Sequence, residues 1–351
     1  MNFHEFTTQV ISEMRRRFPG YDIQVQEIPK LQGESYTGMA IHPSGGDIAL
    51  TMDLEALFDR FRNDLYLGNP MKAIEREIKE AVAQMPQFDT EALTNYERMK
   101  EKLTLQLVPS AKNKNLLTDI PHRNIEDMAL AYRFDMGHNE RTSYSILVTN
   151  KMLNAYGISA AQLHDDALEA ASHSCPATLR NMNEVIRNMA GQTDPSPIWV
   201  ASIENGQNGA GVIQYPHFLD DAAETLGGSF YVLPSSIHEV LLLADDTSPS
   251  LSELENMVRT INQAEVAPEE RLSDNVFHYD CETHIFENAR TFEARQSAME
   301  QSVANAELFE AAKPDTMTVL LVQPNTYPRV VQIGTALEDL QHAVDGDIEA
   351  V

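Results

Sequence analysis

The chain has 351 residues, 42% of them apolar, and a formal net charge of −27. This length allows two or three modest domains, and the apolar fraction allows a hydrophobic core that needs no disulfide bonds. The charge excludes binding to nucleic acid through a broad basic face. No apolar run approaches the roughly 20 residues that a helix needs to cross a bilayer, so no contact with a membrane is expected.

The negative charge is concentrated in the second part of the chain. Residues 1–200 contain 27 acidic and 20 basic residues, whereas residues 201–351 contain 26 and 6. One interpretation is a solvated surface, and the other is a surface that imitates nucleic acid or docks onto a basic protein. Only two cysteines, Cys175 and Cys281, are present and no secretory signal is visible, which favours a reduced, cytoplasmic protein.

Residues 1–100 are expected to form a first domain, with one helix, a three-stranded meander and further helices. Apolar residues at every third or fourth position predict an amphipathic helix over residues 2–18, which Pro19-Gly20 ends. The expected strands are Tyr21–Ile28, Ser35–Ile41 and Ile48–Met52. Asp53 is expected to cap the next helix, and later helices are expected to begin at Asn69-Pro70 and after Asp89.

Residues 101–288 are expected to form a central α+β domain. The first expected strands are Leu103–Val108 and the antiparallel pair Met128–Phe134 and Ser143–Val148, and the next are Ile198–Ile203 and Gly211–Ile213. The expected helices are Ser159 to about Ser172, where Ser159 and Gln162 form a capping box, then Thr178–Met189 and Phe218–Leu226. The polar segment Asn113–Asp119 is expected to be irregular.

The clearest structural signal in this domain is the stretch Gly227–Asp246. Its β-rich runs Ser229–Leu233 and His238–Ala244 flank a Pro-Ser-Ser break, which predicts a hairpin. The second run is apolar at nearly every position, which predicts a strand in the middle of a sheet. Ser250 and Glu253 then predict a capped helix, and a second hairpin is expected from Val276–Tyr279 and Thr283–Phe286.

The C-terminal part changes in character. Residues 289–314 predict a long, mostly exposed connector helix, because few large apolar residues occur from Asn288 to Ala312. Residues 315–351 predict a small ββα module with strands Met317–Val322 and Arg329–Ile333 and a helix that Thr335 and Glu338 cap. The sequence ends on an apolar run, Ile348–Val351, and two strands and one helix rarely bury a core alone. The module is therefore expected to pack on the main body, on a partner, or on residues outside this sequence.

Taken together, these elements predict an α+β fold, with mixed and mainly antiparallel sheets covered by helices.

One spacing is typical of metal ligands. His278, Cys281 and His284 flank a predicted tight turn, and zinc favours imidazole nitrogen and thiolate ligands. A structural zinc site needs four ligands, however, and no fourth is evident. The alternative is a polar hairpin tip with one half-buried cysteine, so no metal, cofactor or catalytic residue is assigned.

Three further motifs invite a catalytic interpretation. The loop Gly206–Gly211 is rich in glycine, but a strand rather than a helix is expected to follow it, which favours a hairpin or mobile loop over a phosphate-binding loop. Ser235, Ser236 and His238 could supply a nucleophile and a base, yet adjacency in sequence provides no oxyanion hole. His164-Asp165-Asp166 lacks the further histidines of a metal-dependent phosphohydrolase, and acidic residues near a helix N-terminus already favour the helix.

Several segments together resemble a known family. They are MNFHEFTTQVISEM, DLEALFDRF, IEDMALAYRFDM, LVTNKMLNAYGISAAQLHDDALEAA and LSDNVFHYD. Over about residues 1–288 the chain resembles an uncharacterised bacterial family of integrative and conjugative elements of gut Gram-positive bacteria. It is also distantly similar to a second uncharacterised Gram-positive cytoplasmic family. The ending from Met317 resembles the first part of a small uncharacterised domain of phages and mobile elements. These resemblances imply a fold and a genetic context, and no catalytic residue.

The sequence leaves two hypotheses for function. The first is a non-enzymatic accessory or binding protein of a mobile element that acts through protein–protein contact, in a sharper form as an acidic DNA mimic or anti-defence factor. The second is an enzyme of unfamiliar type, a hydrolase with a site near Pro234–His238. An enzyme should show a pocket where polar side chains converge, and a binder an exposed apolar or charged face.

Overall fold

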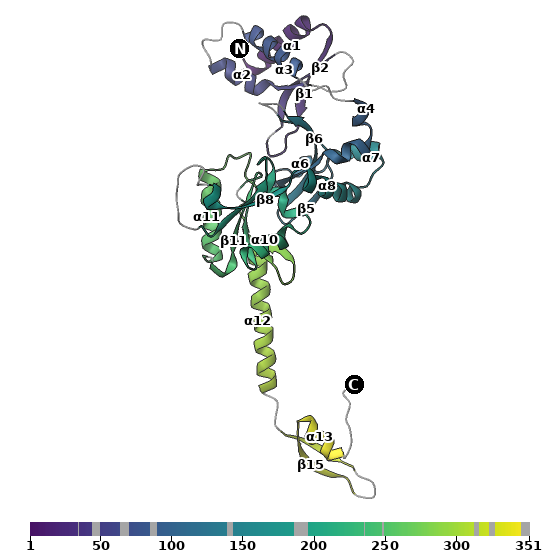
Figure 1. Cartoon of the computed structure of the whole chain (residues 1–351), viewed down its shortest axis with the longest axis vertical. Helices are drawn as coiled ribbons and strands as arrows, with labels where there is room; N and C mark the ends of the chain where they lie inside the picture. The colour runs from purple at the N-terminus through teal and green to yellow at the C-terminus, as the bar shows by residue number, and fades with distance from the viewer. Residues whose placement is uncertain are drawn as a thin grey trace. The chain divides into compact units, whose positions relative to one another are not determined.

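The structure is a computed structural model of the chain. It describes residues 1–33, 35–43, 50–63, 70–84, 90–138, 143–185, 196–234, 236–247, 249–311, 316–322 and 327–344. The chain divides into two units, Met1–Arg290 and Thr291–Val351. Helices and antiparallel sheets alternate along it (Figure 1), which confirms the predicted α+β class.

The first unit begins with a three-stranded antiparallel sheet and three helices. The elements are α1 (Phe3–Arg17), β1 (Tyr21–Ile28), β2 (Tyr36–Pro43), β3 (Leu50–Asp53), α2 (Leu54–Asn63) and α3 (Pro70–Gln84). The helix α1 begins at a capping box between Asn2 and Glu5, and α2 begins where the Asp53 carboxylate accepts the first free N–H groups of the helix. These are the elements that the sequence predicts for this part of the chain.

Apolar side chains between these helices and the sheet form a separate core. The helix α1 packs on β1 and α2 packs on β2, and α1 also contacts α2 and α3. Phe6, Val10 and Met14 on α1 are fully buried there, at the spacing of three to four residues that one helix face requires. This arrangement leaves the other side of α1 available to line a surface.

A four-stranded sheet follows. Its elements and the helices around it are α4 (Thr90–Leu93), α5 (Tyr96–Met99), η1 (Lys100–Lys102), β4 (Leu103–Pro109), α6 (Lys114–Leu117), β5 (His122–Ile125), β6 (Met128–His138), β7 (Ser143–Leu147), α7 (Asn150–Tyr156) and α8 (Ala160–Ser174). The long strand β6 pairs with β4 on one side and with both β5 and β7 on the other. The expected β6–β7 pair and the helix from Ser159 are confirmed, and the Ser159 hydroxyl accepts the N–H of Gln162 at 3.1 Å.

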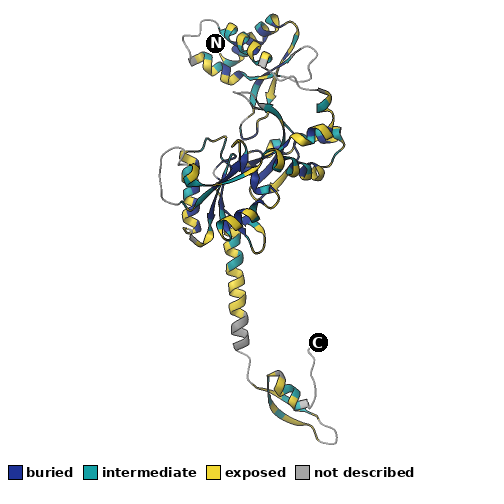
Figure 2. Cartoon of the chain, viewed as in Figure 1, coloured by how far each residue is buried: buried dark blue, intermediate teal, exposed yellow. Residues whose placement is uncertain are grey.

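A six-stranded antiparallel sheet completes the first unit. Its elements are β8 (Ala177–Asn181), β9 (Ile198–Ile203), η2 (Gly209–Gln214), α10 (Phe218–Leu226), β10 (Phe230–Leu233), β11 (Val240–Ala244), η3 (Asp245–Thr247), α11 (Leu251–Ala264), β12 (Phe277–Asp280) and β13 (Ile285–Asn288). The strand order is β13-β12-β10-β11-β9-β8, so the predicted β10–β11 hairpin does lie in the middle of a sheet. One shared apolar core joins this sheet to the four-stranded sheet (Figure 2).

Three expectations for this region are wrong. The predicted helix Thr178–Met189 is wrong in its first part, which is the strand β8 up to Asn181, because pairing with β9 satisfies an edge that would otherwise expose its N–H and C=O groups. Residues 182–185 are helical as predicted, and residues 186–189 lie outside the described residues. The predicted strand Gly211–Ile213 is part of the 3₁₀ helix η2, which buries Val212 and Ile213 in the shared core. The supposedly irregular segment Asn113–Asp119 contains the short helix α6.

The second unit contains the remaining predicted elements. They are α12 (Ala289–Ala311), which begins at the end of the first unit, β14 (Thr316–Leu321), β15 (Arg329–Gly334) and α13 (Leu337–Val344). The described part of α12 is largely exposed (Figure 2), and the connector helix and ββα module are confirmed. Leu320 and Val330 are paired on an exposed face of the hairpin. The run Ile348–Val351 lies outside the described residues.

No helix in the described ranges has both the length and the apolar composition that a membrane span requires.

The glycine-rich loop before η2 has a structural explanation. Gly206 has a φ of +69°, which a residue with a side chain rarely adopts. A Cβ atom on Gly209 would lie 2.2 Å from Ser202 Oγ and 2.6 Å from the His238 carbonyl oxygen. The loop therefore needs glycine at these positions in order to close over the ends of β9 and β11.

This close approach predicts that Gly209→Ala lowers the free energy of unfolding by about 1–3 kcal/mol, because the added methyl group overpacks the contact. Thermal or urea unfolding of the purified chain measures the effect. Gly228→Ala is the matched control, since a Cβ atom there meets nothing within 4 Å. Equal stability of the two variants would contradict the explanation.

Candidate functional site

The three residues with metal-like spacing do not converge. The imidazole of His278 is fully buried and its Nε2 lies 3.0 Å from Asp245 Oδ2. The ring of His284 instead contacts Asp220 Oδ1 at 2.7 Å and the Tyr279 hydroxyl at 3.2 Å. Neighbouring residues 278 and 279 of β12 point to opposite faces of the sheet, so the two imidazoles lie on opposite faces as well.

The third member of this set has its own contact. Cys281 Sγ lies 3.4 Å from Ser229 Oγ, which donates to it, and both cysteines of the chain are free thiols. Among the residues that the structure describes, no three histidine, cysteine or acidic side chains are grouped so that they could hold a metal ion.

The Pro234–His238 break does not present a serine–histidine pair in its described residues. His238 Nδ1 accepts the backbone N–H of Asn208 at 3.1 Å, and its Nε2 lies 3.5 Å from Glu270 Oε1. The Ser236 hydroxyl oxygen accepts the backbone N–H of His238 at 3.0 Å. Both ring nitrogens are therefore engaged with other groups, and neither is directed at the Ser236 hydroxyl. Ser235 lies outside the described residues.

His164 is buried in a network that fixes its protonation state. A guanidinium can only donate, so the 2.6 Å contact from Arg123 Nη1 makes His164 Nε2 an acceptor. The Nδ1–H must then donate to the Tyr132 hydroxyl oxygen, 3.0 Å away. Burial, and then the nearby Arg123 charge, lower the pKa of His164, while burial raises the pKa of Tyr132 to about 12. This neutral histidine supports the fold, and Asp166 on the same helix accepts the Tyr96 hydroxyl instead.

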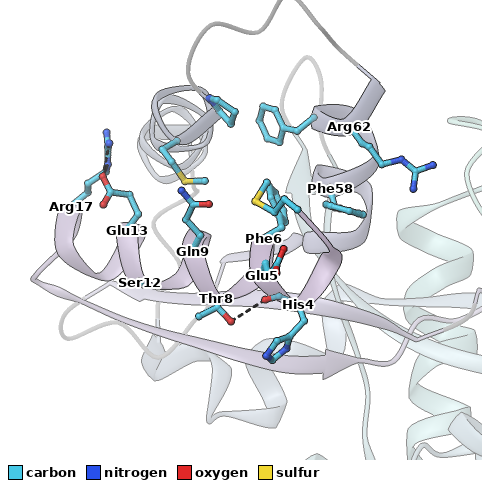
Figure 3. Close-up of a pocket in the computed structure, with 14 residues that line it drawn as sticks. His4, Glu5, Phe6, Thr8, Gln9, Ser12, Glu13, Arg17, Phe58 and Arg62 are labelled. Carbon is cyan, nitrogen blue, oxygen red and sulfur yellow. Dashed lines mark hydrogen bonds and ion pairs between the residues drawn. The ribbon is translucent and has the colours of Figure 1, made fainter.

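A large hollow of the described surface lies among the first three helices. We call it the α1–α2–α3 groove, and its volume is about 1200 Å³. Apolar side chains of the first core reach it, and polar side chains of α1 and α2 surround them (Figure 3). The apolar lining residues are Met1, Phe6, Phe58, Phe61, Pro70 and Met71, and the polar ones are His4, Glu5, Thr8, Gln9, Ser12, Glu13, Arg17 and Arg62.

The aromatic residues of this groove are held in place by the core beneath it. The Phe6 ring is fully buried and lies 5.3 Å from the ring of Phe58 and 6.1 Å from that of Phe61, measured between centroids. Phe58 and Phe61 are only partly buried, so part of each ring faces the groove. Such a rigid, half-covered aromatic surface is suited to receiving apolar side chains.

An ion-pair network fixes one end of the groove. Figure 3 shows Glu13 and Arg17 together near the C-terminal end of α1, and Arg17 also pairs with Glu75 on α3. The hydrogen bonds from Arg16 and then Arg17 lower the pKa of Glu13 to about 2. Glu13 is therefore ionised at any physiological pH and cannot act as a general acid or base there. At this end of the groove the charged side chains are engaged in ion pairs with one another.

This site was hard to predict from the sequence. Three helices that are separated in the chain contribute to it, and its polar residues occupy the positions of α1 that a helical wheel assigns to solvent. Only the paired aromatics Phe58 and Phe61 on one short helix are a signal in retrospect, and both also pack against the core beneath the groove.

Comparison with known proteins identifies two families. Residues 3–281 match the model of a family of unknown function, DUF5688, and residues 317–351 match a domain of unknown function, DUF3846. The resemblances over about residues 1–288 and from Met317 are thus confirmed as resemblances to families of unknown function. These matches carry no information on the element or the host, and they do not test the distant similarity to a second family. No curated protein and no solved structure matches the chain.

The His164 network makes a prediction about pH. NMR titration of the imidazole should give a pKa below 6.5, and Arg123→Gln should raise it part of the way back, because burial remains. As the pH falls from 6.5 towards the native pKa, the unfolded chain takes up the proton first, so this group lowers the free energy of unfolding in that window. Titration at or above 6.5 in the native protein would contradict the assigned network.

Proposed function

Because the chain belongs to the DUF5688 family, whose function is unknown, we propose a function from the geometry of the site. The protein is a non-enzymatic, cytoplasmic accessory protein of a mobile genetic element, and it acts through protein–protein contact. The observation that carries the proposal is the α1–α2–α3 groove, in which partly exposed aromatic rings lie between polar edges. The resemblance described above supports the genetic context, and the free thiols Cys175 and Cys281 support a reducing compartment.

The partner segment that fits this groove best is an amphipathic helix. Helix-in-groove recognition uses apolar anchors at i, i+3 or i+4 and i+7, which enter a trough with an apolar floor. Phe6, Gln9 and Glu13 follow this same spacing along α1, so the groove runs parallel to a helix face. The partner's apolar side chains would contact Phe58 and Phe61, and its polar side would face solvent.

The charges around the groove support an apolar rather than an ionic mode of recognition. Residues 1–84 contain 13 acidic and 9 basic residues, which is far closer to balance than residues 201–351. Glu13 already pairs with Arg16 and Arg17, and Glu75 with Arg17 and Lys79. Affinity should therefore depend only weakly on salt, because exposed pairs of this kind contribute little.

A blocking substitution tests the proposal. Gln9 is exposed and points into the groove (Figure 3), so Gln9→Arg should fill the trough without disturbing the core and weaken partner binding at least tenfold. Ala56→Arg, at an exposed position of α2 outside the lining, is the matched control. Capture from a nuclease-treated lysate of source cells identifies the partner, and calorimetry with the purified partner measures the three affinities.

Loss of binding in Gln9→Arg and its retention in Ala56→Arg would support the groove. The proposal would be overturned if both variants bound equally well or if no protein were captured. Either result would favour the hypothesis of an enzyme. The same capture addresses the imitation of nucleic acid by the acidic part of the chain. A basic nucleic-acid enzyme that is released by high salt and is unaffected by Gln9→Arg would favour that form of the hypothesis.

A further inference from the structure

Arg133 occupies an unusual position for a charged residue. It lies in the middle of β6, the strand with partners on both sides, where its backbone is paired with Thr104 and Leu147. Its side chain is half-buried across the sheet. Nε donates to Ser145 Oγ at 3.0 Å, and Nη1 donates to Gln106 Oε1 at 3.3 Å. Both acceptors are neutral.

No carboxylate in the described part of the chain pairs with this guanidinium. Asp135 is the nearest acidic residue along the strand, but it is exposed and its Oδ1 accepts the backbone N–H of Gly137 at 2.8 Å. Burial is the cause that lowers the pKa of Arg133, and no neighbouring carboxylate offsets it. A partly desolvated charge without a counter-charge is costly, so the site is electrostatically incomplete.

Within the described part of the chain, some donors of the guanidinium have no acceptor. An arginine has five N–H groups in a planar fork, and the two contacts above use two of them, which leaves three, two of them on Nη2. Two adjacent N–H groups match the two oxygens of a carboxylate in a bidentate pair.

A small cavity of about 80 Å³ adjoins this side chain. Its other lining residues include Asn205, Gln207 and Asn208 of the glycine-rich loop, together with Tyr144 and Cys175. A water molecule takes about 30 Å³ of liquid, so the cavity has room for only a few heavy atoms. It thus combines the Arg133 guanidinium and polar amide side chains with the exposed Asp135 carboxylate, whose Oδ1 accepts the Gly137 N–H, in a space of the right size for a small polar group.

The loop that closes the cavity is held rigidly. Asn205 Oδ1 accepts the N–H of Gln207 at 2.9 Å, and the N–H of Asn208 donates to His238. Gly209 is wedged against Ser202 and the His238 carbonyl, as described above. The amide side chains beside Arg133 are therefore carried by a preorganised backbone, which reduces the entropy that binding would cost.

We propose that this cavity is a binding site for a small carboxylate, which pairs with the Arg133 guanidinium and is enclosed by Asn205, Gln207 and Asn208. The site favours one negative charge, because no carboxylate of the described residues pairs with the Arg133 guanidinium. A dianion such as phosphate is disfavoured by the Asp135 carboxylate in the same lining. This site shares no lining residue with the α1–α2–α3 groove, so it is independent of the function proposed above.

Titration of the whole chain with sodium acetate tests the site. At constant ionic strength, acetate should shift the Arg133 Nε–H resonance saturably and raise the melting temperature more than chloride does. The efficiency limit for a ligand of four heavy atoms sets the dissociation constant at about tens of micromolar or weaker. Arg133→Gln should abolish the gain in melting temperature, and Arg133→Lys, which keeps the charge but loses the fork, should weaken binding about tenfold. Arg180→Gln, an exposed arginine of β8, should bind acetate as the native chain does.

Several outcomes would overturn the proposal. They are an acetate response no larger than that of chloride, phosphate binding tighter than acetate, or equal loss of binding in Arg180→Gln. If Arg133→Gln does not fold, the resonance shift in the native chain and the Arg133→Lys variant still decide the question. An acetylated dipeptide and its C-terminally amidated form distinguish the source of the carboxylate. Tighter binding of the free-acid peptide than of acetate indicates a chain terminus, and equal binding indicates a small molecule.

Discussion

The first unit depends on one strand, β6, that must satisfy three partners. A strand has two hydrogen-bonding edges, and the eleven residues of β6 use one edge for β4 and divide the other between β5 and β7. Because side chains alternate between faces, Leu130, Tyr132 and Phe134 all enter the core that joins the two sheets. The same alternation places Arg133 on the opposite face, at the point where the partner strand changes from β5 to β7. The location of the charged residue therefore follows from the packing of its apolar neighbours.

Much of this fold could be predicted from the sequence wherever the signal is local. The helix α10 has the predicted bounds, and the β10–β11 hairpin was predicted from its apolar runs and the Pro-Ser-Ser break between them. The helix start at Ser250 was also predicted correctly from its capping residues. The Glu253 carboxylate accepts both the N–H and the hydroxyl of Ser250. Local sequence patterns predicted the wrong secondary structure for the residues of β8 and η2. Residues Ala177–Asn181 form a strand because β9 offers an edge, and that edge is invisible in the residues themselves.

The candidate sites were less predictable than the fold, for a physical reason. A motif read along the chain assumes that residues close in sequence point at a common centre, and strand geometry prevents that for His278 and His284. The glycine-rich loop was noticed correctly, but its glycines serve a turn and a close contact with Ser202. Both hollows described above are instead assembled from distant segments. The groove needs three helices, and the Arg133 cavity needs β4, β6, β7 and the loop before η2.

The arginines at these two hollows differ in whether a carboxylate pairs with them. Arg16 is exposed and Arg17 is partly buried, and both have carboxylate partners although water could solvate much of their charge. Arg133 is also partly buried, yet its acceptors are a hydroxyl and an amide. The chain contains twice as many acidic as basic residues, 53 against 26, so a counter-charge for Arg133 would have been easy to supply from within the sequence. Neutral neighbours orient the guanidinium without neutralising it, which leaves its charge available to a ligand. Because no carboxylate of the described residues pairs with Arg133, the proposed carboxylate ligand would supply the counter-charge at this position.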